Sequence, residues 1–180
     1  MRPLASRVRD AALAASGVAA KLALAAALAA TTTVATMLVQ IPVPPTRGYL
    51  NFGDIMVFTS ALLFGRFVGG VAGGIGSAVA DVITGYGYFA PYTLVIKGLE
   101  GYLAGTIRDG KSTRRDVLGW LVGALVMVSG YFLTEAYVMA FGVPAALVEV
   151  PSNMVQVLSG AVIAIPLARG LRNRIPKILI

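Results

Sequence analysis

The 180-residue sequence contains no cysteine and no histidine. These absences exclude disulfides, thiolate or imidazole metal sites, and catalysis by a histidine base. Charged residues are also scarce, at 13% of the chain, whereas an ordinary soluble domain has roughly 25%. Because 57% of the residues are apolar, too few polar side chains remain to cover a water-soluble surface. The sequence therefore predicts an integral membrane protein with no metal, no cofactor and no catalytic residue.

Six charge-poor runs are long enough, or nearly long enough, to cross a bilayer, which takes about 20 apolar residues. They cover residues of about 17–39, 52–65, 67–84, 91–107, 116–141 and 145–168. We therefore expect residues 1–180 to form one all-α transmembrane domain, a bundle of six helices in the plasma membrane.

The basic residues orient this bundle. When the six spans are threaded through a membrane, twelve of the fifteen Lys and Arg residues fall on one side. They are Arg2, Arg7, Arg9, Arg66, Arg108, Lys111, Arg114, Arg115, Arg169, Arg172, Arg174 and Lys177. Only Arg47 falls on the other side. By the positive-inside rule both termini are cytoplasmic, and the net charge of +7 marks topology rather than a nucleic-acid partner.

Polar side chains of the predicted spans gather in the outer half of the bundle. Such groups are costly in a membrane and usually functional, and with nearby tyrosines they describe a small-molecule pocket. The alternative is an aromatic belt at the membrane surface with a structural Lys97–Glu100 ion pair. The outer segment 40–50, which holds three prolines, could cover the pocket. The predicted ligand contacts are Asn51, Asp81, Lys97, Glu100, Glu135, Asn153 and Gln156, with Tyr86 and Tyr131 as possible stacking partners.

The charge balance of this set constrains the ligand. Spans three to six carry three carboxylates in their outer half, and Lys97 is the only ammonium there. If Lys97 pairs with Glu100, then Asp81 and Glu135 remain unmatched and would repel an anionic ligand. The sequence therefore favours a neutral or weakly basic ring over an anion such as pantothenate.

Two further patterns bear on partners. The first span is smooth because small side chains recur along it, at Ala19, Ala23, Ala26 and Ala30. Such a helix is either buried or a docking surface for another membrane subunit, and the sequence leaves both readings open. Residues 105–112, GTIRDGKS, match the phosphate-binding P-loop pattern, but a spanning helix precedes them where a P-loop needs a buried strand.

Several stretches together resemble the substrate-binding S components of energy-coupling factor (ECF) vitamin transporters. The resemblance extends over nearly the whole chain. The stretches are IPVP at 41–44, GYLNFGD at 48–54, ALLFG at 61–65, GGIGSAVAD at 73–81, GYGYFAPYTLVIKGLEG at 85–101 and PSNMVQ at 151–156.

The resemblance implies a division of labour. Such a subunit binds a vitamin or its precursor from outside at high affinity, and has no ATPase of its own. It docks on a membrane T component carrying two cytoplasmic ATPases, through an A-x-x-x-A motif that the first-span alanines can supply. The members that this branch resembles are assigned to hydroxymethylpyrimidine, pyridoxine, pantothenate or riboflavin, of which the charge balance favours the first two.

Two other function classes remain as alternatives. A self-sufficient proton-coupled secondary transporter would use Asp81 or Glu135 as its proton carrier, but the internal repeats common in such transporters are not evident here. A membrane enzyme is disfavoured because the chain lacks the usual catalytic and metal-binding residues.

Overall fold

The computed structural model describes the backbone of residues 4–175 and the side chains from residue 15 to 175. This part of the chain forms six α-helices, which confirms the expected all-helical class. A π-helical turn η1 (Thr134–Val138) continues α5, and a 3-10 turn η2 (Arg172–Arg174) follows α6. The helices are α1 (Leu4–Leu38), α2 (Gly53–Phe64), α3 (Arg66–Ile83), α4 (Ala90–Ile107), α5 (Thr113–Leu133) and α6 (Val143–Leu171).

Each expected span overlaps one helix, and the largest difference is at the start of α1. That helix has 35 residues and begins at Leu4 rather than near residue 17. A search for charge-poor runs detects only the part of a helix that suits lipid, and α-helical hydrogen bonding continues through charged residues. Arg2 and Lys177, two of the residues used to predict the orientation, lie outside the described residues.

Four helical segments are long and apolar enough to cross a membrane: Ala15–Leu38, Arg66–Ile83, Thr113–Val138 and Val143–Arg174. Helix α2 is apolar but has only 12 residues. It meets α3 at Gly65, whose φ of +86° is the left-handed conformation that glycine adopts most easily. Helix α4 is less apolar because it carries buried charged groups, which are described below.

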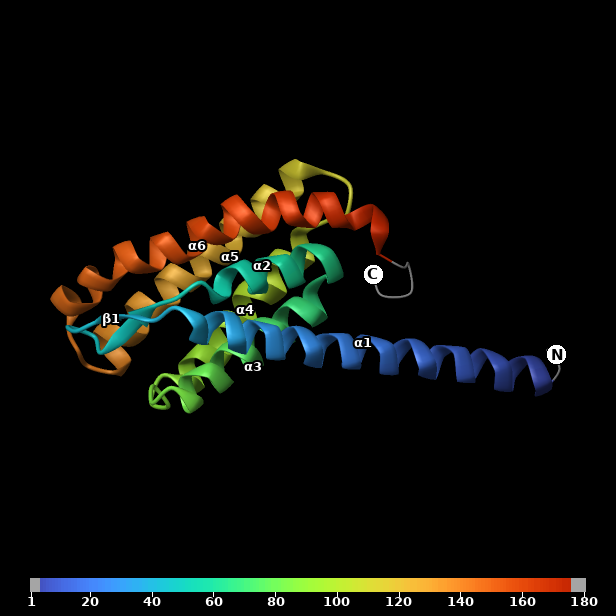
Figure 1. Ribbon diagram of the computed structural model, residues 1–180, viewed down its shortest axis with the longest axis horizontal. Coiled ribbons are helices and arrows are strands. Elements are labelled where there is room, and N and C mark those ends of the chain that lie inside the picture. The colour runs from blue at the N-terminus through green and yellow to red at the C-terminus, as the bar shows by residue number, and fades with distance from the viewer. Residues whose placement is uncertain (1–3, 176–180) are drawn as a thin grey trace.

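The outer segment predicted as a proline-stiffened cover contains a short hairpin that the sequence did not predict. Strand β1 (Ile41–Val43) pairs antiparallel with β2 (Gly48–Leu50), with Ile41 opposite Leu50. Three-residue strands are too short for an alternating pattern to stand out in a sequence. The hairpin lies at one end of the bundle, and the start of α1 and the end of α6 lie at the other (Figure 1).

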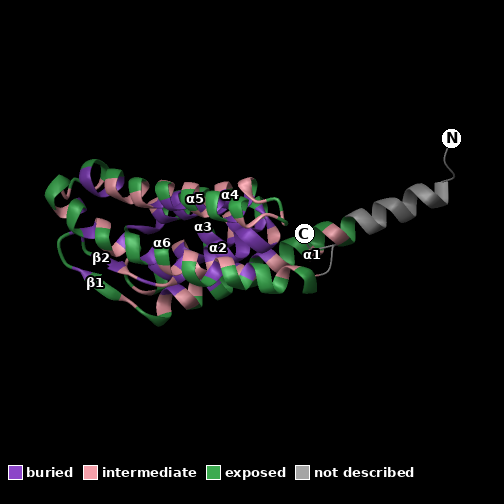
Figure 2. Ribbon diagram, turned by 90° about the horizontal axis from the view of Figure 1, so that it is seen from above, coloured by how far each residue is buried: buried purple, intermediate pink, exposed green. Residues whose placement is uncertain are grey.

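Glycine allows α3 to approach its neighbours closely. A Cβ atom at Gly69 would lie 2.7 Å from both the Ala61 Cα and the Gly101 carbonyl oxygen, which is too close for any larger residue. This close packing agrees with the small-residue spacing of α3 and α4. The core residues Phe58, Met127 and Val157 are nearly inaccessible. Exposed stretches of ribbon lie along the outside of the bundle and buried stretches lie toward its interior (Figure 2).

Three polar side chains join the helices at the end away from the hairpin. Arg108 Nη1 donates hydrogen bonds to the carbonyl oxygens of Leu62 and Leu63, at 3.1 and 2.8 Å. Arg172 Nη2 lies 2.9 Å from both oxygens of the buried Asp116. The two hydrogen bonds from Arg108 satisfy carbonyl groups at the end of α2 that have no partner within the helix. Together, Arg108, Arg172 and Asp116 hold the ends of α2, α4, α5 and α6 in contact, on the side that the basic residues predict to be cytoplasmic.

Candidate functional site

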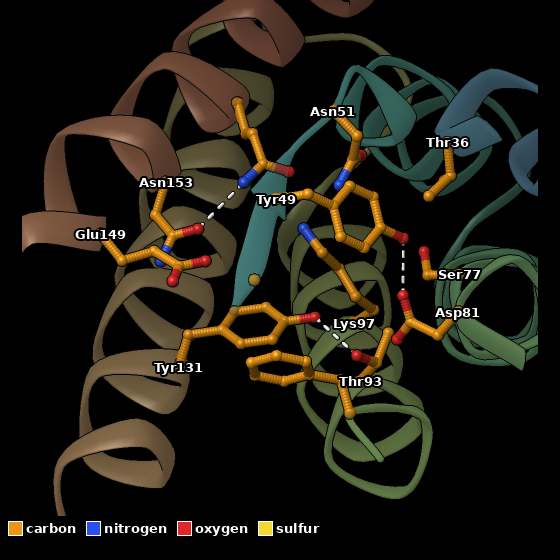
Figure 3. Close-up of a pocket in the computed structure, with 13 residues that line it drawn as sticks. Thr36, Tyr49, Asn51, Ser77, Asp81, Thr93, Lys97, Tyr131, Glu149 and Asn153 are labelled. Atoms are coloured by element: carbon orange, nitrogen blue, oxygen red, sulfur yellow. Dashed lines mark hydrogen bonds between the residues drawn. The ribbon is translucent and has the colours of Figure 1, made fainter. Parts of the chain in front are cut away.

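A polar cavity lies beneath the hairpin, and α1, α3, α4, α5 and α6 contribute to its wall together with β2 and the segment before α2 (Figure 3). The volume open to the centre of a water molecule is about 30 Å³, enough for water but less than a vitamin-sized ring requires. A ligand of that size therefore needs the surrounding side chains to move. The lining residues are Thr36, Gly48, Tyr49, Asn51, Ser77, Asp81, Phe89, Thr93, Lys97, Tyr131, Glu149, Asn153 and Gln156.

Lys97 is already neutralised by two carboxylates. Its ammonium group donates a hydrogen bond to Asp54 and lies 3.0 Å from Glu100 Oε2. All three residues are buried: Lys97 is 2% exposed, and the two acids are 0% exposed. The Lys97–Glu100 ion pair, which belonged to the alternative reading of the sequence, is present, and Asp54 is an additional partner that sequence spacing did not identify. Since one cation here faces two anions, it has no surplus charge for an anionic ligand.

Asp81 connects the end of α3 to the hairpin. Its Oδ1 accepts a hydrogen bond of 2.6 Å from the Tyr49 hydroxyl, whereas Oδ2 is buried without a hydrogen-bond partner. Burial raises the pKa of the Tyr49 hydroxyl, and the nearby charge of Asp81 raises it further. The tyrosine therefore remains a donor, and the free Asp81 oxygen remains an acceptor beside the cavity.

Glu149 connects α6 to the hairpin in the same way. The Thr46 hydroxyl, in the hairpin turn, donates a hydrogen bond to Glu149, and Gly48 packs against this carboxylate so closely that a Cβ atom would overlap it. Asn153 lies one turn further along α6 and Gln156 lies two turns further. Gln156 Nε2 donates to Asn153 Oδ1 at 2.9 Å, and Gln156 Oε1 has no partner. The α6 wall therefore offers acceptors from Glu149 and Gln156, beside one unpartnered donor, Asn153 Nδ2.

Aromatic rings form the remaining wall. The Tyr131 hydroxyl donates to Thr93 Oγ1 at 3.0 Å, and the Tyr131 ring lies 5.9 Å from Lys97 Nζ. Phe89 packs edge-to-face against Tyr131, with 6.5 Å between ring centroids. A planar ligand entering this space would meet ring faces on one side and carboxylate or amide groups on the other.

The structure brings together six of the nine predicted contact residues and places three elsewhere. Glu100 lies behind Lys97 as its ion-pair partner. Tyr86 supports the cavity from outside, with its ring centroid 4.3 Å from that of Tyr49. Glu135 lies in η1, fully buried with both carboxylate oxygens unpartnered, but it does not line the cavity. The six that line the cavity are Asn51, Asp81, Lys97, Tyr131, Asn153 and Gln156.

Sequence reasoning missed several lining residues. Glu149 lies one turn before the predicted Asn153, so helical spacing could have placed it on the same face. Thr36, Ser77 and Thr93 gave no signal because hydroxyls in membrane helices commonly bond their own backbone. Among the described residues, no three acidic side chains converge as a metal site would require.

The first-span alanines lie on the surface. Ala19, Ala23, Ala26 and Ala30 are all exposed, whereas another face of α1 is buried, as at Ala25 and Ala29. Of the two readings that the sequence left open, burial is therefore wrong for these four positions. They form an unobstructed small-residue surface on the outside of the bundle.

The fold and the cavity define a class of protein: a membrane-embedded binding subunit. The chain holds a polar cavity at one end of the bundle. Its P-loop-like segment 105–112 contains no strand, and Asp109 Oδ1 there accepts the backbone N–H groups of Lys111 and Ser112. Those amides are already engaged and do not form a phosphate cradle.

Comparison with known proteins identifies the family. The family model described as "ECF-type riboflavin transporter, S component" matches residues 18–173. A protein of Pyrococcus woesei described as "Uncharacterized protein in gap 3'region" is 50% identical over 148 residues, which cover 82% of this chain and 98% of the relative. The thiamine precursor transporter HmpT of Lactococcus lactis subsp. cremoris (strain MG1363) is 34% identical over 145 residues, 80% of this chain and 82% of that protein.

A solved structure supports the fold. It is titled "Structure and mechanism of the S component of a bacterial ECF transporter" and matches with a TM-score of 0.67 at 18% identity, covering 86% of this chain and 96% of that one. The chain therefore belongs to the S-component family of ECF-type transporters, as its sequence motifs suggested. It is a multi-pass membrane protein and a substrate-binding subunit rather than an enzyme, and this assignment replaces the proton-coupled transporter alternative.

Proposed function

We propose that this S component captures a small, ring-shaped, neutral or weakly basic vitamin precursor. An aminopyrimidine such as hydroxymethylpyrimidine fits best, and pyridoxine has related chemistry. The observation that carries the proposal is the surplus of buried acceptors around the cavity.

The surplus follows from the charge pairing. Because Asp54 and Glu100 already hold Lys97, the carboxylates of Asp81 and Glu149 have only neutral hydroxyl partners in the structure. Buried carboxylate oxygens need donors, and a ring bearing amino and hydroxyl groups supplies them. A carboxylate or phosphate ligand would instead add negative charge to an acidic site.

The relatives give two candidate ligands. HmpT, at 34% identity, is described as a thiamine precursor transporter, which agrees with an aminopyrimidine. The description of the matching family model names riboflavin, so riboflavin is the second candidate. The small cavity favours the smaller of the two, because a three-ring ligand would require the larger displacement of the hairpin and its neighbours.

Calorimetry on the purified protein tests this choice. Hydroxymethylpyrimidine should bind more tightly than riboflavin, and pantothenate should bind weakest. Glu149→Gln should weaken hydroxymethylpyrimidine binding by roughly 1.5–3 kcal/mol, the usual contribution of a hydrogen bond to a charged group.

Glu135→Gln is the matched control. It removes the same charge from another buried glutamate, one that lies outside the cavity but close enough for its charge to act on Glu149, so affinity should fall much less than in Glu149→Gln. Equal losses in the two variants would contradict the assigned site. Tight pantothenate binding would overturn the charge argument.

We propose further that the exposed alanine face of α1 docks on a membrane T component carrying two ATPases. An S component has no ATPase of its own by family resemblance, so uptake requires such a module. Close helix approach needs small side chains, and Ala19, Ala23, Ala26 and Ala30 provide a continuous row of them.

A further inference from the structure

A groove runs along the outer face of α3 and α4, away from the ligand cavity. Its floor contains Gly70 and Gly98, and its walls include Phe67, Val95, Leu99 and Tyr102. The four wall side chains are between 42% and 58% exposed. Within a transmembrane bundle, such an exposed apolar groove faces lipid and suits an apolar chain better than a polar solute.

One end of the groove is basic. Arg66, the first residue of α3, lines both the groove and an adjoining polar notch. The notch also contains Arg108, the backbone of Gly65 and Gly105, and Thr106 and Asp109. The apolar groove and the polar notch therefore meet at a single arginine.

The notch has an unpaired cationic donor in Arg66. No side chain caps the start of α3, and Gly105 packs closely against the backbone nitrogen of Arg66, so the guanidinium group rather than the helix start is the donor open to an anion. Arg66 makes no ion pair with any described acidic residue, and its guanidinium carbon lies 6.0 Å from the centroid of the Tyr102 ring. The acid in the notch, Asp109, is occupied by backbone donors from Lys111 and Ser112.

We propose that this groove binds an anionic phospholipid. One acyl chain lies over Gly70 and Gly98, and the phosphate lies at the start of α3 between Arg66 and Arg108. The positive-inside orientation places Arg66 at the cytoplasmic leaflet, where anionic lipids gather and where basic pockets between helices bind their headgroups. Charge complementarity favours this occupant over a second apolar helix, which would leave Arg66 without a counter-ion.

Native mass spectrometry of protein released from nanodiscs tests the headgroup. The nanodiscs contain equal parts of phosphatidylcholine and phosphatidylglycerol, and retained lipids are counted by type. Arg66→Gln should lower the preference for phosphatidylglycerol about fivefold, the effect expected for one basic residue near anionic lipid. Arg169→Gln is the matched control, because Arg169 is exposed on α6, which packs on α2 and α5 rather than beside the groove.

A second pair of variants tests the acyl chain. A Cβ atom at Gly98 would have its nearest neighbours at 3.7 Å, so Gly98→Ala should fit and retain lipid. Gly98→Leu should fill the groove and reduce retention of both lipid types, with the thermal midpoint unchanged.

Three results would overturn the proposal. The first is an unchanged phosphatidylglycerol preference in Arg66→Gln, and the second is an equal loss in Arg169→Gln. The third is normal lipid retention in Gly98→Leu with loss of assembly, which would show that the groove receives a protein helix. Each result is independent of the vitamin that the cavity binds.

Discussion

Replacing Lys97 with methionine separates a structural lysine from one that holds the ligand. The substitution leaves Asp54 and Glu100, both fully buried, without their shared cation. Removing one member of a buried ion pair usually costs about 3–5 kcal/mol because the remaining charge is uncompensated. For a chain of this size, that loss corresponds to a fall in the thermal unfolding midpoint of roughly 6–20 °C.

A neutralised triple variant provides the internal check. Lys97→Met combined with Asp54→Asn and Glu100→Gln removes all three charges and should recover most of the lost stability. Lys21→Met is the surface control, since Lys21 is exposed on α1, and its midpoint should match the unmodified protein. The measurement is thermal unfolding in detergent without ligand. If Lys97→Met unfolds at the normal temperature but no longer binds ligand, then Lys97 serves the ligand and the charge reasoning fails.

Three further predictions concern coupling, docking and orientation. Lys111→Ala should leave uptake by the assembled transporter unchanged, because its loop is no phosphate site; loss of uptake would contradict this. Ala26→Trp, on the exposed face of α1, should retain ligand binding but abolish uptake, whereas Ala25→Trp, on the buried face, should destabilise the protein; equal effects would show that the exposed face has no special role. In intact cells an impermeant thiol reagent should label Pro45→Cys, at the exposed hairpin turn, and not Lys111→Cys; the opposite pattern would reverse the topology.

The helical architecture could be predicted because lipid imposes simple rules. Backbone groups in a bilayer must be satisfied within helices, and an apolar run of sufficient length marks each one. The same rules do not cover the hairpin, whose β1 and β2 have three residues each. They also cannot show that α1 continues back to Leu4, because a helix outside lipid needs no apolar run.

The cavity could be predicted only in part. The depth in the membrane that the sequence predicts for Asp81, Lys97 and Asn153 correctly placed them near one end of the bundle, because depth follows from orientation and helical rise. The sequence does not give the rotation of each helix about its own axis. For this reason Glu135 was expected in the cavity but does not line it, whereas Glu149 lines it and was not predicted. The pairing of Lys97 with Asp54, 43 residues away, depends on tertiary packing that spacing cannot reveal.

The most direct test of the central claim is to identify the small molecule that copurifies with the protein. A high-affinity binding subunit should retain its natural ligand through gentle purification, and mass spectrometry of the released molecule should give an aminopyrimidine or pyridoxine-like ring. The amount retained should fall in Glu149→Gln and persist in Glu135→Gln. Recovery of pantothenate or another anion, retained equally by both variants, would contradict the proposed acceptor-rich site.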